Sequence, residues 1–164
     1  MKRGLLVAAI CCFLVGCGTQ KEFETVSDVY EAEPALKQQV VLSLPQEAST
    51  PAFSGETTGE LYLCDGYVLT VQTLPGGDLD KTFRELTGFS RDALRPVETQ
   101  RQGVKRYDCV FTSAGEGENQ INRVVVLDDG AYHYAVSVMA GESQTGKLTS
   151  TWQKLLESVT LSTG

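Results

Sequence analysis

The stretch that decides the fold is residues 120–140, QINRVVVLDDGAYHYAVSVMA. Two runs rich in β-branched and aromatic residues, 121–128 and 131–140, flank the dipeptide Asp129-Gly130, which is a strong signal for a β-hairpin. Apolar side chains recur on both faces of both runs, and this pattern predicts a hairpin that is covered on two sides. With Asp128 placed opposite Ala131, the expected cross-strand pairs are Leu127–Tyr132, Val125–Tyr134, Arg123–Val136, Val126–His133 and Val124–Ala135.

A second hairpin is predicted earlier in the chain, where residues 60–64 and 67–72 flank Asp65-Gly66. We expect a type I′ turn there, which requires positive φ at both central residues. The other strand signals are a short apolar run that Pro45 ends and a longer run at 104–112. The Ser-, Thr-, Pro- and Gly-rich residues 45–58 read as a loop.

Two helices interrupt the strands. Asp78 can cap a helix in which Leu79, Phe83 and Leu86 form an apolar stripe, and Gly88 suits the position just past its end. Residues 89–103 read as irregular, with one helical turn after Ser90. After a polar loop at 141–146, the final helix, about 146–158, carries Leu148, Trp152 and Leu155 on one side, and residues 159–161 close the chain.

The order of strands, helix, strands and helix, joined by hairpins, predicts an α+β fold with an antiparallel sheet of about six strands on which a central and a C-terminal helix pack. Three segments in this layout, Leu44-Pro45, Asp129-Gly130-Ala131-Tyr132 and residues 152–161, resemble the PsbP-like and DcrB-like α/β/α sandwiches. The resemblance covers about residues 38–162. It implies a small exported or lipidated module that binds protein partners and has no catalytic motif.

The N-terminus carries an export signal: basic Lys2 and Arg3, an apolar run over residues 5–15, and then Gly16 and Cys17. Leu14-Val15-Gly16-Cys17 resembles a bacterial lipobox, which implies cleavage before Cys17 and membrane attachment through acyl chains such as palmitate on that residue. The alternatives are an ordinary signal peptide cut elsewhere and a short anchor that stays in place. We therefore expect a signal peptide at 1–16, an acidic tether at 17–36 and one globular domain at 37–164. Residues 22–31 have the spacing of a short helix, which the sequence leaves open.

The charge of the chain limits its partners. The net charge is −7, and removal of residues 1–16 takes away two basic and no acidic residues, which leaves −9. An acidic body is repelled by nucleic acid and by anionic headgroups, so membrane attachment depends on the acyl chains. The expected location is the extracytoplasmic face of a bacterial membrane, without a nucleic acid or nucleotide partner.

The cysteines that remain after export are Cys64 and Cys109, since Cys11 and Cys12 leave with the signal and Cys17 is lipidated. An oxidising envelope allows them to pair, and closing this loop of about 45 residues would stabilise the fold by roughly 4 kcal/mol. Two buried free thiols are the alternative.

Candidate catalytic motifs are weak. The stretch 141–148, GESQTGKL, nearly matches a phosphate-binding loop, but Leu148 replaces the hydroxyl residue that holds Mg²⁺, and no parallel βαβ unit can form around it. His133 is the sole histidine, too few for a zinc site. The aspartates considered for Ca²⁺ have turn or capping roles and form no calcium-loop motif; they are Asp65, Asp78, Asp80, Asp128 and Asp129. We expect no enzyme activity, metal or cofactor.

Aromatic side chains on the predicted strands are the remaining candidates for recognition: Tyr62, Tyr67, Tyr107, Tyr132 and Tyr134. We predict a lipid-anchored extracytoplasmic binding or accessory module that recognises another protein of the cell envelope. The alternative is a binder of a small ligand or carbohydrate that serves a transporter. A cleft lined by these tyrosines would favour the second function, and a flat apolar patch would favour the first.

Overall fold

The computed structural model describes residues 37–48, 50–55 and 59–162, which belong to one compact unit, Leu36–Gly164. The predicted signal peptide 1–16 and the tether 17–36, with Cys17 and the segment 22–31, lie outside the described residues. The elements are, in chain order, β1 (Val40–Val41), the 3-10 turn η2 (Gln46–Ala48), β2 (Phe53–Gly55), β3 (Gly59–Cys64), β4 (Tyr67–Pro75), α1 (Leu79–Thr87), α2 (Arg91–Leu94), β5 (Val97–Arg101), β6 (Val104–Ala114), β7 (Asn119–Asp128), β8 (Tyr132–Gly141), α3 (Glu142–Glu157) and β9 (Thr160–Leu161).

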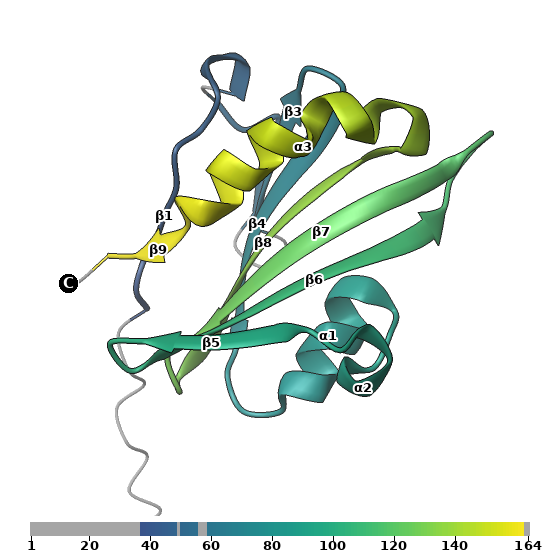
Figure 1. The fold of residues 1–164 in the computed structure, drawn as a ribbon. Coiled ribbons are helices and arrows are strands. Elements are labelled where there is room, and N and C mark those ends of the chain that lie inside the picture. The colour runs from purple at the N-terminus through teal and green to yellow at the C-terminus, as the bar shows by residue number, and fades with distance from the viewer. Residues whose placement is uncertain (1–36, 49, 56–58, 163–164) are drawn as a thin grey trace, which may run out of the picture. The chain divides into compact units, whose positions relative to one another are not determined.

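The predicted fold class is confirmed: the domain is an antiparallel sheet with helices on both faces. The main sheet has seven strands in the order β2-β3-β4-β8-β7-β6-β5. The helix α3 crosses one face, which we call the α3 face, while α1 and α2 pack on the other, the α1 face (Figure 1). A separate pair, β1 with β9, joins the two ends of the described chain. Within the described residues, no helix combines the length and apolar character that spanning a membrane requires.

Two edge strands were missed by the sequence prediction. The strand β5 falls in the segment expected to be irregular, and all five of its residues are exposed. The strand β2 falls in the expected loop and has three residues. Edge strands of this kind carry few buried side chains, so they lack the apolar alternation by which strands are recognised.

The central β7–β8 hairpin forms, but the predicted register is wrong by two residues. Leu127 pairs with Tyr134 and Val125 with Val136. The cause is Asp129, whose Oδ1 accepts hydrogen bonds from the N–H groups of Ala131 (2.9 Å) and Tyr132 (2.8 Å), so four residues rather than two form the turn. Because side chains alternate with period two, a shift of two residues leaves each on its expected face. The prediction that both faces are covered at this hairpin is therefore confirmed.

The other Asp-Gly turn also differs in detail from its prediction. Cys64 pairs with Tyr67, which confirms the two-residue connection, but of its central residues only Gly66 has positive φ (79°). The turn that has positive φ at both central residues, as type I′ requires, is Gln102 (52°) and Gly103 (83°), between β5 and β6.

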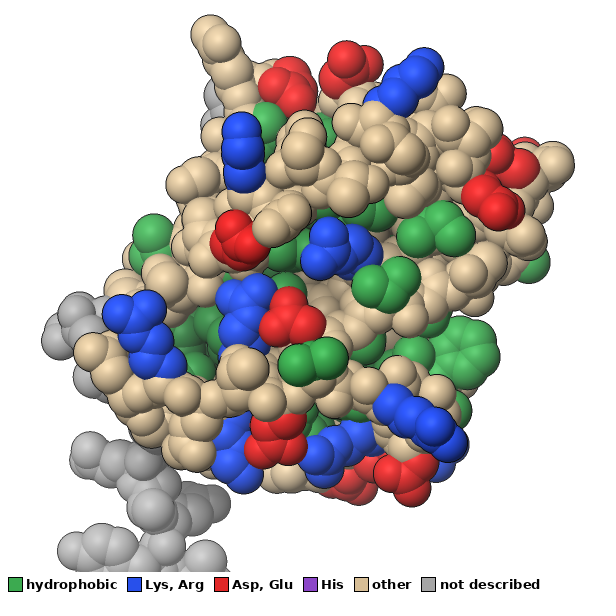
Figure 2. All heavy atoms as spheres, viewed as in Figure 1, with side chains coloured by type: hydrophobic (Ala, Val, Ile, Leu, Met, Phe, Trp, Pro, Cys, Tyr) green, Lys and Arg blue, Asp and Glu red, His purple; other side chains and the backbone are tan. Residues whose placement is uncertain are grey.

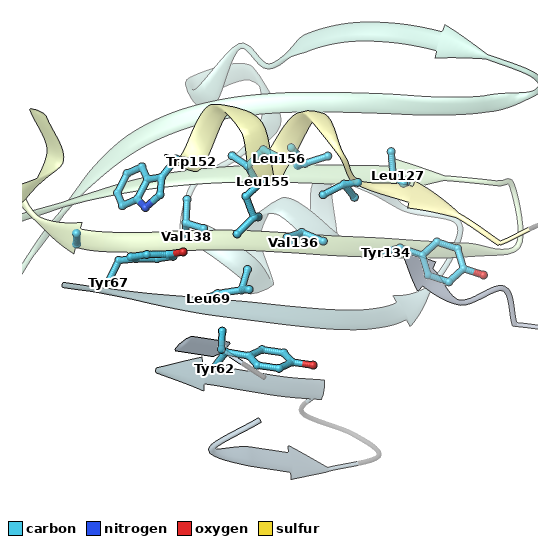
Figure 3. Close-up of a cluster of buried hydrophobic side chains, with 14 residues drawn as sticks. Tyr62, Tyr67, Leu69, Leu127, Tyr134, Val136, Val138, Trp152, Leu155 and Leu156 are labelled. Atoms are coloured by element: carbon cyan, nitrogen blue, oxygen red, sulfur yellow. The ribbon is translucent and has the colours of Figure 1, made fainter. Parts of the chain in front are cut away.

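The larger core lies between α3 and the sheet. Trp152, Leu155 and Leu156 project from α3 onto Val136 and Val138 of β8 (Figure 3). The ring of Trp152 meets that of Tyr67 edge to face, with 6.0 Å between centroids. The smaller core, on the α1 face, packs Phe83 against Tyr107, Cys109, Val124, Val126 and Ala135.

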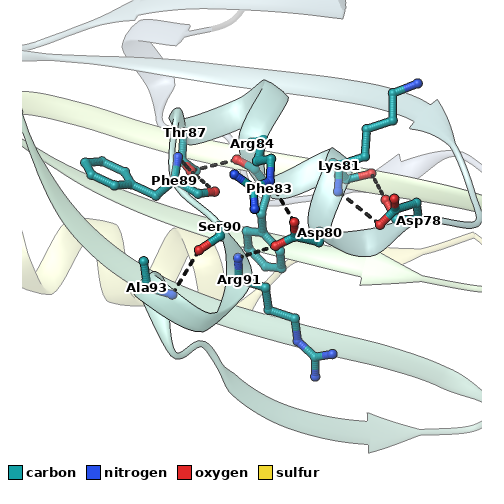
Figure 4. A network of polar contacts seen from close by, with 11 residues as sticks. Asp78, Asp80, Lys81, Phe83, Arg84, Thr87, Phe89, Ser90, Arg91 and Ala93 are labelled. Carbon is teal, nitrogen blue, oxygen red and sulfur yellow. Dashed lines mark hydrogen bonds and ion pairs between the residues drawn. The ribbon is translucent and has the colours of Figure 1, made fainter.

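The helix α1 begins and ends as the sequence predicts. Asp78 accepts a hydrogen bond from the Lys81 N–H (3.1 Å), and Gly88, with φ of 80°, closes the C-terminus (Figure 4). The helical turn expected after Ser90 is α2, where the Ser90 hydroxyl accepts from the Ala93 N–H (3.3 Å).

Candidate functional site

The five tyrosines proposed for recognition do not share a surface. Tyr62, Tyr67 and Tyr134 are buried in the core under α3, and Tyr107 is buried in the cluster on the opposite face. Tyr132 is partly exposed, with Lys37 Nζ 5.7 Å from its ring centroid. The structure thus corrects the expected role, because four of the five rings are packing residues.

Burial also removes these phenols from acid–base chemistry near neutral pH. It raises the pKa of Tyr62 to about 12, with a further contribution from the hydrogen bond that its hydroxyl donates to Glu60 Oε2 (2.7 Å). It likewise raises the pKa of Tyr134, which donates to Asp129 Oδ2 (3.0 Å), to about 12. Both hydroxyl groups therefore stay protonated and serve as fixed donors.

His133 has partners that sequence reasoning missed. Its Nδ1 lies 2.6 Å from Thr82 Oγ1, and its Nε2 lies 3.8 Å from Asp128 Oδ1. A hydroxyl, an imidazole and a carboxylate in a row are the groups that nucleophilic catalysis uses. However, Thr82 is 3% and His133 1% exposed, so a substrate has no path to the hydroxyl. The contact between Thr82 on α1 and His133 on β8 holds α1 against the sheet.

Four of the five aspartates considered for calcium, all but Asp65, accept hydrogen bonds within the fold. Asp80 accepts from the Arg91 N–H (2.8 Å) and from Arg84 Nε (2.7 Å), and these two bonds hold its pKa below the usual value (Figure 4). Asp128 accepts from the Gly130 N–H (2.8 Å). Across the part of the chain that the structure describes, no group of three or more His, Cys, Asp or Glu side chains is placed to hold a metal ion.

The stretch that nearly matches a phosphate-binding loop is not a loop. The helix α3 begins at Glu142, four residues before the predicted start, so Gly146 and Lys147 lie within it. The carboxylate of Glu118 occupies the N-terminus of α3, where it accepts hydrogen bonds from the N–H (2.9 Å) and hydroxyl (3.1 Å) of Ser143. A carboxylate there complements the helix dipole, which explains the early start.

The disulfide considered between Cys64 and Cys109 does not form. Both thiols are free; Cys64 packs against the core under α3, whereas Cys109 belongs to the cluster on the α1 face. Their strands, β3 and β6, are separated by three others, which places them about 19 Å apart, whereas a disulfide joins Cα atoms about 6 Å apart. Burial raises the pKa of Cys109 to about 11 and also raises that of Cys64, so both are poor nucleophiles.

A shallow groove of about 360 Å³ runs between α3 and β6 on the α3 face. Figure 2 shows basic and acidic side chains side by side in the hollow between these elements. Arg106 forms a two-point contact with Asp108 (2.7 and 3.0 Å) and donates to the carbonyl oxygen of Leu156 (3.0 Å) at the end of α3. This pair anchors the helix, and Arg123 also lines the groove.

On the opposite side of the sheet, exposed apolar side chains gather over β2, β3, β4 and β8, while Val97 and Val110 are exposed on the α3 face. In the register of the strands, Leu63 lies beside Val68, and Val68 beside Met139. Phe53 and Leu61 form a neighbouring row. We call these five residues the open face. Leu63 is 63%, Phe53 56% and Met139 37% exposed, while Leu61 and Val68 are half-buried.

The open face exists because α1 is short. Its nine residues span about 14 Å, whereas seven strands extend about 29 Å across the sheet. The helices α1 and α2 therefore cover the half with β6 and β7 and leave the half with β2, β3 and β4. The row through Leu63 continues beyond Met139 to Asn122 and Phe111.

The open face carries no charged side chain. Its second row continues from Leu61 through Thr70 and Ser137, both uncharged. At its border, Phe89 (42% exposed) meets the ring of Phe111 at 5.8 Å between centroids. The sequence did indicate such a surface. Residues 61–64 place apolar side chains on both faces of the sheet, but only two helices were predicted to cover these faces. What was missing was the direction in which each helix packs.

The chain was compared with protein families, curated proteins and solved structures. No family model matches the sequence, so the PsbP-like and DcrB-like resemblance stays one of layout. A search of curated proteins finds no match. Among solved structures, the chain is similar to LpqN, involved in cell envelope biogenesis of Mycobacterium tuberculosis, with 12% sequence identity and a TM-score of 0.49 over 80% of this chain and 88% of that chain.

Proposed function

We propose that this protein is a lipid-anchored, extracytoplasmic binding module that recognises another protein of the cell envelope through the open face and catalyses no reaction. The observation that carries the proposal is the open face itself: a contiguous, uncharged apolar surface over β2, β3, β4 and β8 that none of the described helices covers. Exposed apolar patches of this kind mark interaction sites.

The anchor part of the proposal depends on Leu14-Val15-Gly16-Cys17. Acyl chains on Cys17 would hold an acidic body at a membrane for which it has no electrostatic affinity. Mass spectrometry of the chain purified from an expressing bacterium tests this directly. We expect a mature chain that begins at Cys17 and carries a diacylglycerol adduct on that residue, and an unmodified chain with another N-terminus would refute the anchor.

Protein recognition is better supported than small-ligand recognition. A small-ligand site would bury most of its ligand in a cleft lined by a few precisely placed polar groups. Four of the five tyrosines expected to line such a cleft are buried, and Arg106 and Asp108 in the groove beside α3 are paired with each other. The open face is apolar, as protein interfaces are at their centre.

Photo-crosslinking in living cells tests recognition. A photoreactive phenylalanine analogue replaces Leu63 on the open face or, as a matched control, Val110, which is 58% exposed on the α3 face. We expect position 63, and not position 110, to crosslink one envelope protein, and we expect Met139→Glu to abolish that product. Equal products from both positions, or none from position 63, would refute recognition through this face.

A further inference from the structure

We propose that the occupant of the open face is a single amphipathic helix, about three turns long with an uncharged apolar stripe, supplied by the partner protein. This inference rests on the proposed function and names the kind of partner element that the surface fits. It follows from the size of the surface, its lack of charge and the hydrogen bonding that a sheet face allows.

The dimensions of the surface match one helix. The open face spans the four strands β2, β3, β4 and β8, about 14 Å at the usual strand spacing. A helix rises 1.5 Å per residue, so about 10 residues cover that span. The two rows of the open face are roughly 14 Å wide with their side chains, close to the 10–12 Å diameter of a helix.

On the other face of the sheet, a helix of the protein itself covers the strands. The 16-residue helix α3 packs Trp152, Leu155 and Leu156 against the strands β4, β8 and β7. The open face presents the reverse side of β4 and β8, where α1 does not reach. A helix from the partner would complete there the layer that α1 begins, with the Phe89–Phe111 pair at the junction.

An extended peptide fits less well. Laid on the face of a sheet, it would bury backbone N–H and C=O groups without partners, each at a cost of about 1–3 kcal/mol, whereas a helix satisfies its own. The absence of charge on the face argues that the helix stripe is uncharged too, since a charge buried there would have no partner.

Selection from displayed peptide libraries tests the inference on the full chain purified from an expressing bacterium. One library of 14-residue peptides randomises apolar residues at helical spacing (i, i+3, i+4, i+7), and a second library has the same composition at alternating spacing. We expect the helical library to yield binders, and Leu63→Glu to weaken them about tenfold or more, as loss of a central interface contact does. The matched variant Val110→Glu, on the α3 face, should leave binding unchanged.

Each other outcome overturns the inference. Binders from the alternating library alone, binders that Leu63→Glu leaves unaffected, or no binders from either library would all exclude a helix on the open face. The proposed function fails separately. If position 63 still crosslinks one envelope protein in cells while the helical library yields nothing, recognition through the open face stands and only the helix is wrong.

Discussion

Replacing Asp129 with alanine should lower the free energy of unfolding by about 3 kcal/mol, because one carboxylate organises the central hairpin. Its Oδ1 accepts from the N–H groups of Ala131 and Tyr132, and its Oδ2 accepts from the Tyr134 hydroxyl (3.0 Å) and the Gln38 side chain (3.2 Å). Each bond to a charged acceptor contributes roughly 1.5–3 kcal/mol when buried. The four bonds sum to about 6 kcal/mol at the lower end of this range. Water replaces part of this at the half-exposed turn, so we take about half of that lower sum.

The pH dependence of this effect has a definite sign. Burial alone would raise the pKa of the Asp129 carboxyl, but the hydrogen bonds from the turn N–H groups and the two side chains outweigh it and hold the pKa below its usual value. Stabilisation by a carboxyl whose folded-state pKa is depressed is complete above its unfolded pKa, about 3.9. It is lost as the pH falls from there through the folded-state pKa. The advantage of the native protein over Asp129→Asn should therefore shrink below about pH 4.

Urea or guanidinium unfolding followed by circular dichroism measures both quantities. The matched control is Asp65→Ala in the other Asp-Gly turn, where the aspartate is exposed and the expected change is within about 0.5 kcal/mol. The reasoning is refuted if Asp129→Ala destabilises the protein no more than Asp65→Ala does. It is also refuted if the gap between the native protein and Asp129→Asn is the same at pH 6 and pH 3.

Two further predictions concern the buried polar groups. Thr82→Val should lower the free energy of unfolding, measured in denaturant, by about 1–3 kcal/mol, because it leaves Nδ1 of the buried His133 without its partner at 2.6 Å. Thr149→Val removes a hydroxyl hydrogen bond on the exposed side of α3. An equal loss of stability from this control would contradict the prediction. Cys64 and Cys109 should both appear as free thiols by mass after alkylation in denaturant, and a reducing agent should leave the melting temperature unchanged. In the folded protein, Cys109 should alkylate very slowly at pH 8, since with a pKa of about 11 only about 0.1% is thiolate; rapid labelling would show that it is neither buried nor shifted.

Chain topology explains why the cysteine and tyrosine predictions went wrong. Cys64 and Cys109 were considered as a pair because their number is even and the chain is exported, which says nothing about strand order. In the sheet they lie on opposite faces with three strands between them. Likewise, a tyrosine on a strand is exposed or buried according to which helix packs over it. Tyr107 is buried because α1 reaches β6, and Tyr67 because α3 reaches β4.

The sequence by itself determined what short-range interactions control: both Asp-Gly hairpins, the capped helix from Leu79 to Thr87, and hence an antiparallel sheet with helices packed on it. Alternating side chains and capping groups act within a few residues, so they can be read without coordinates. Only the tertiary structure decided the hairpin register, through the bonds of Asp129, and the existence of the open face. The register depends on local bonds, from the Asp129 carboxylate to the N–H groups two and three residues on, and the alternation of side chains does not reveal them because a shift of two residues keeps every side chain on its face. The exposure of an apolar residue such as Leu63 depends on whether a helix from elsewhere in the chain packs over it.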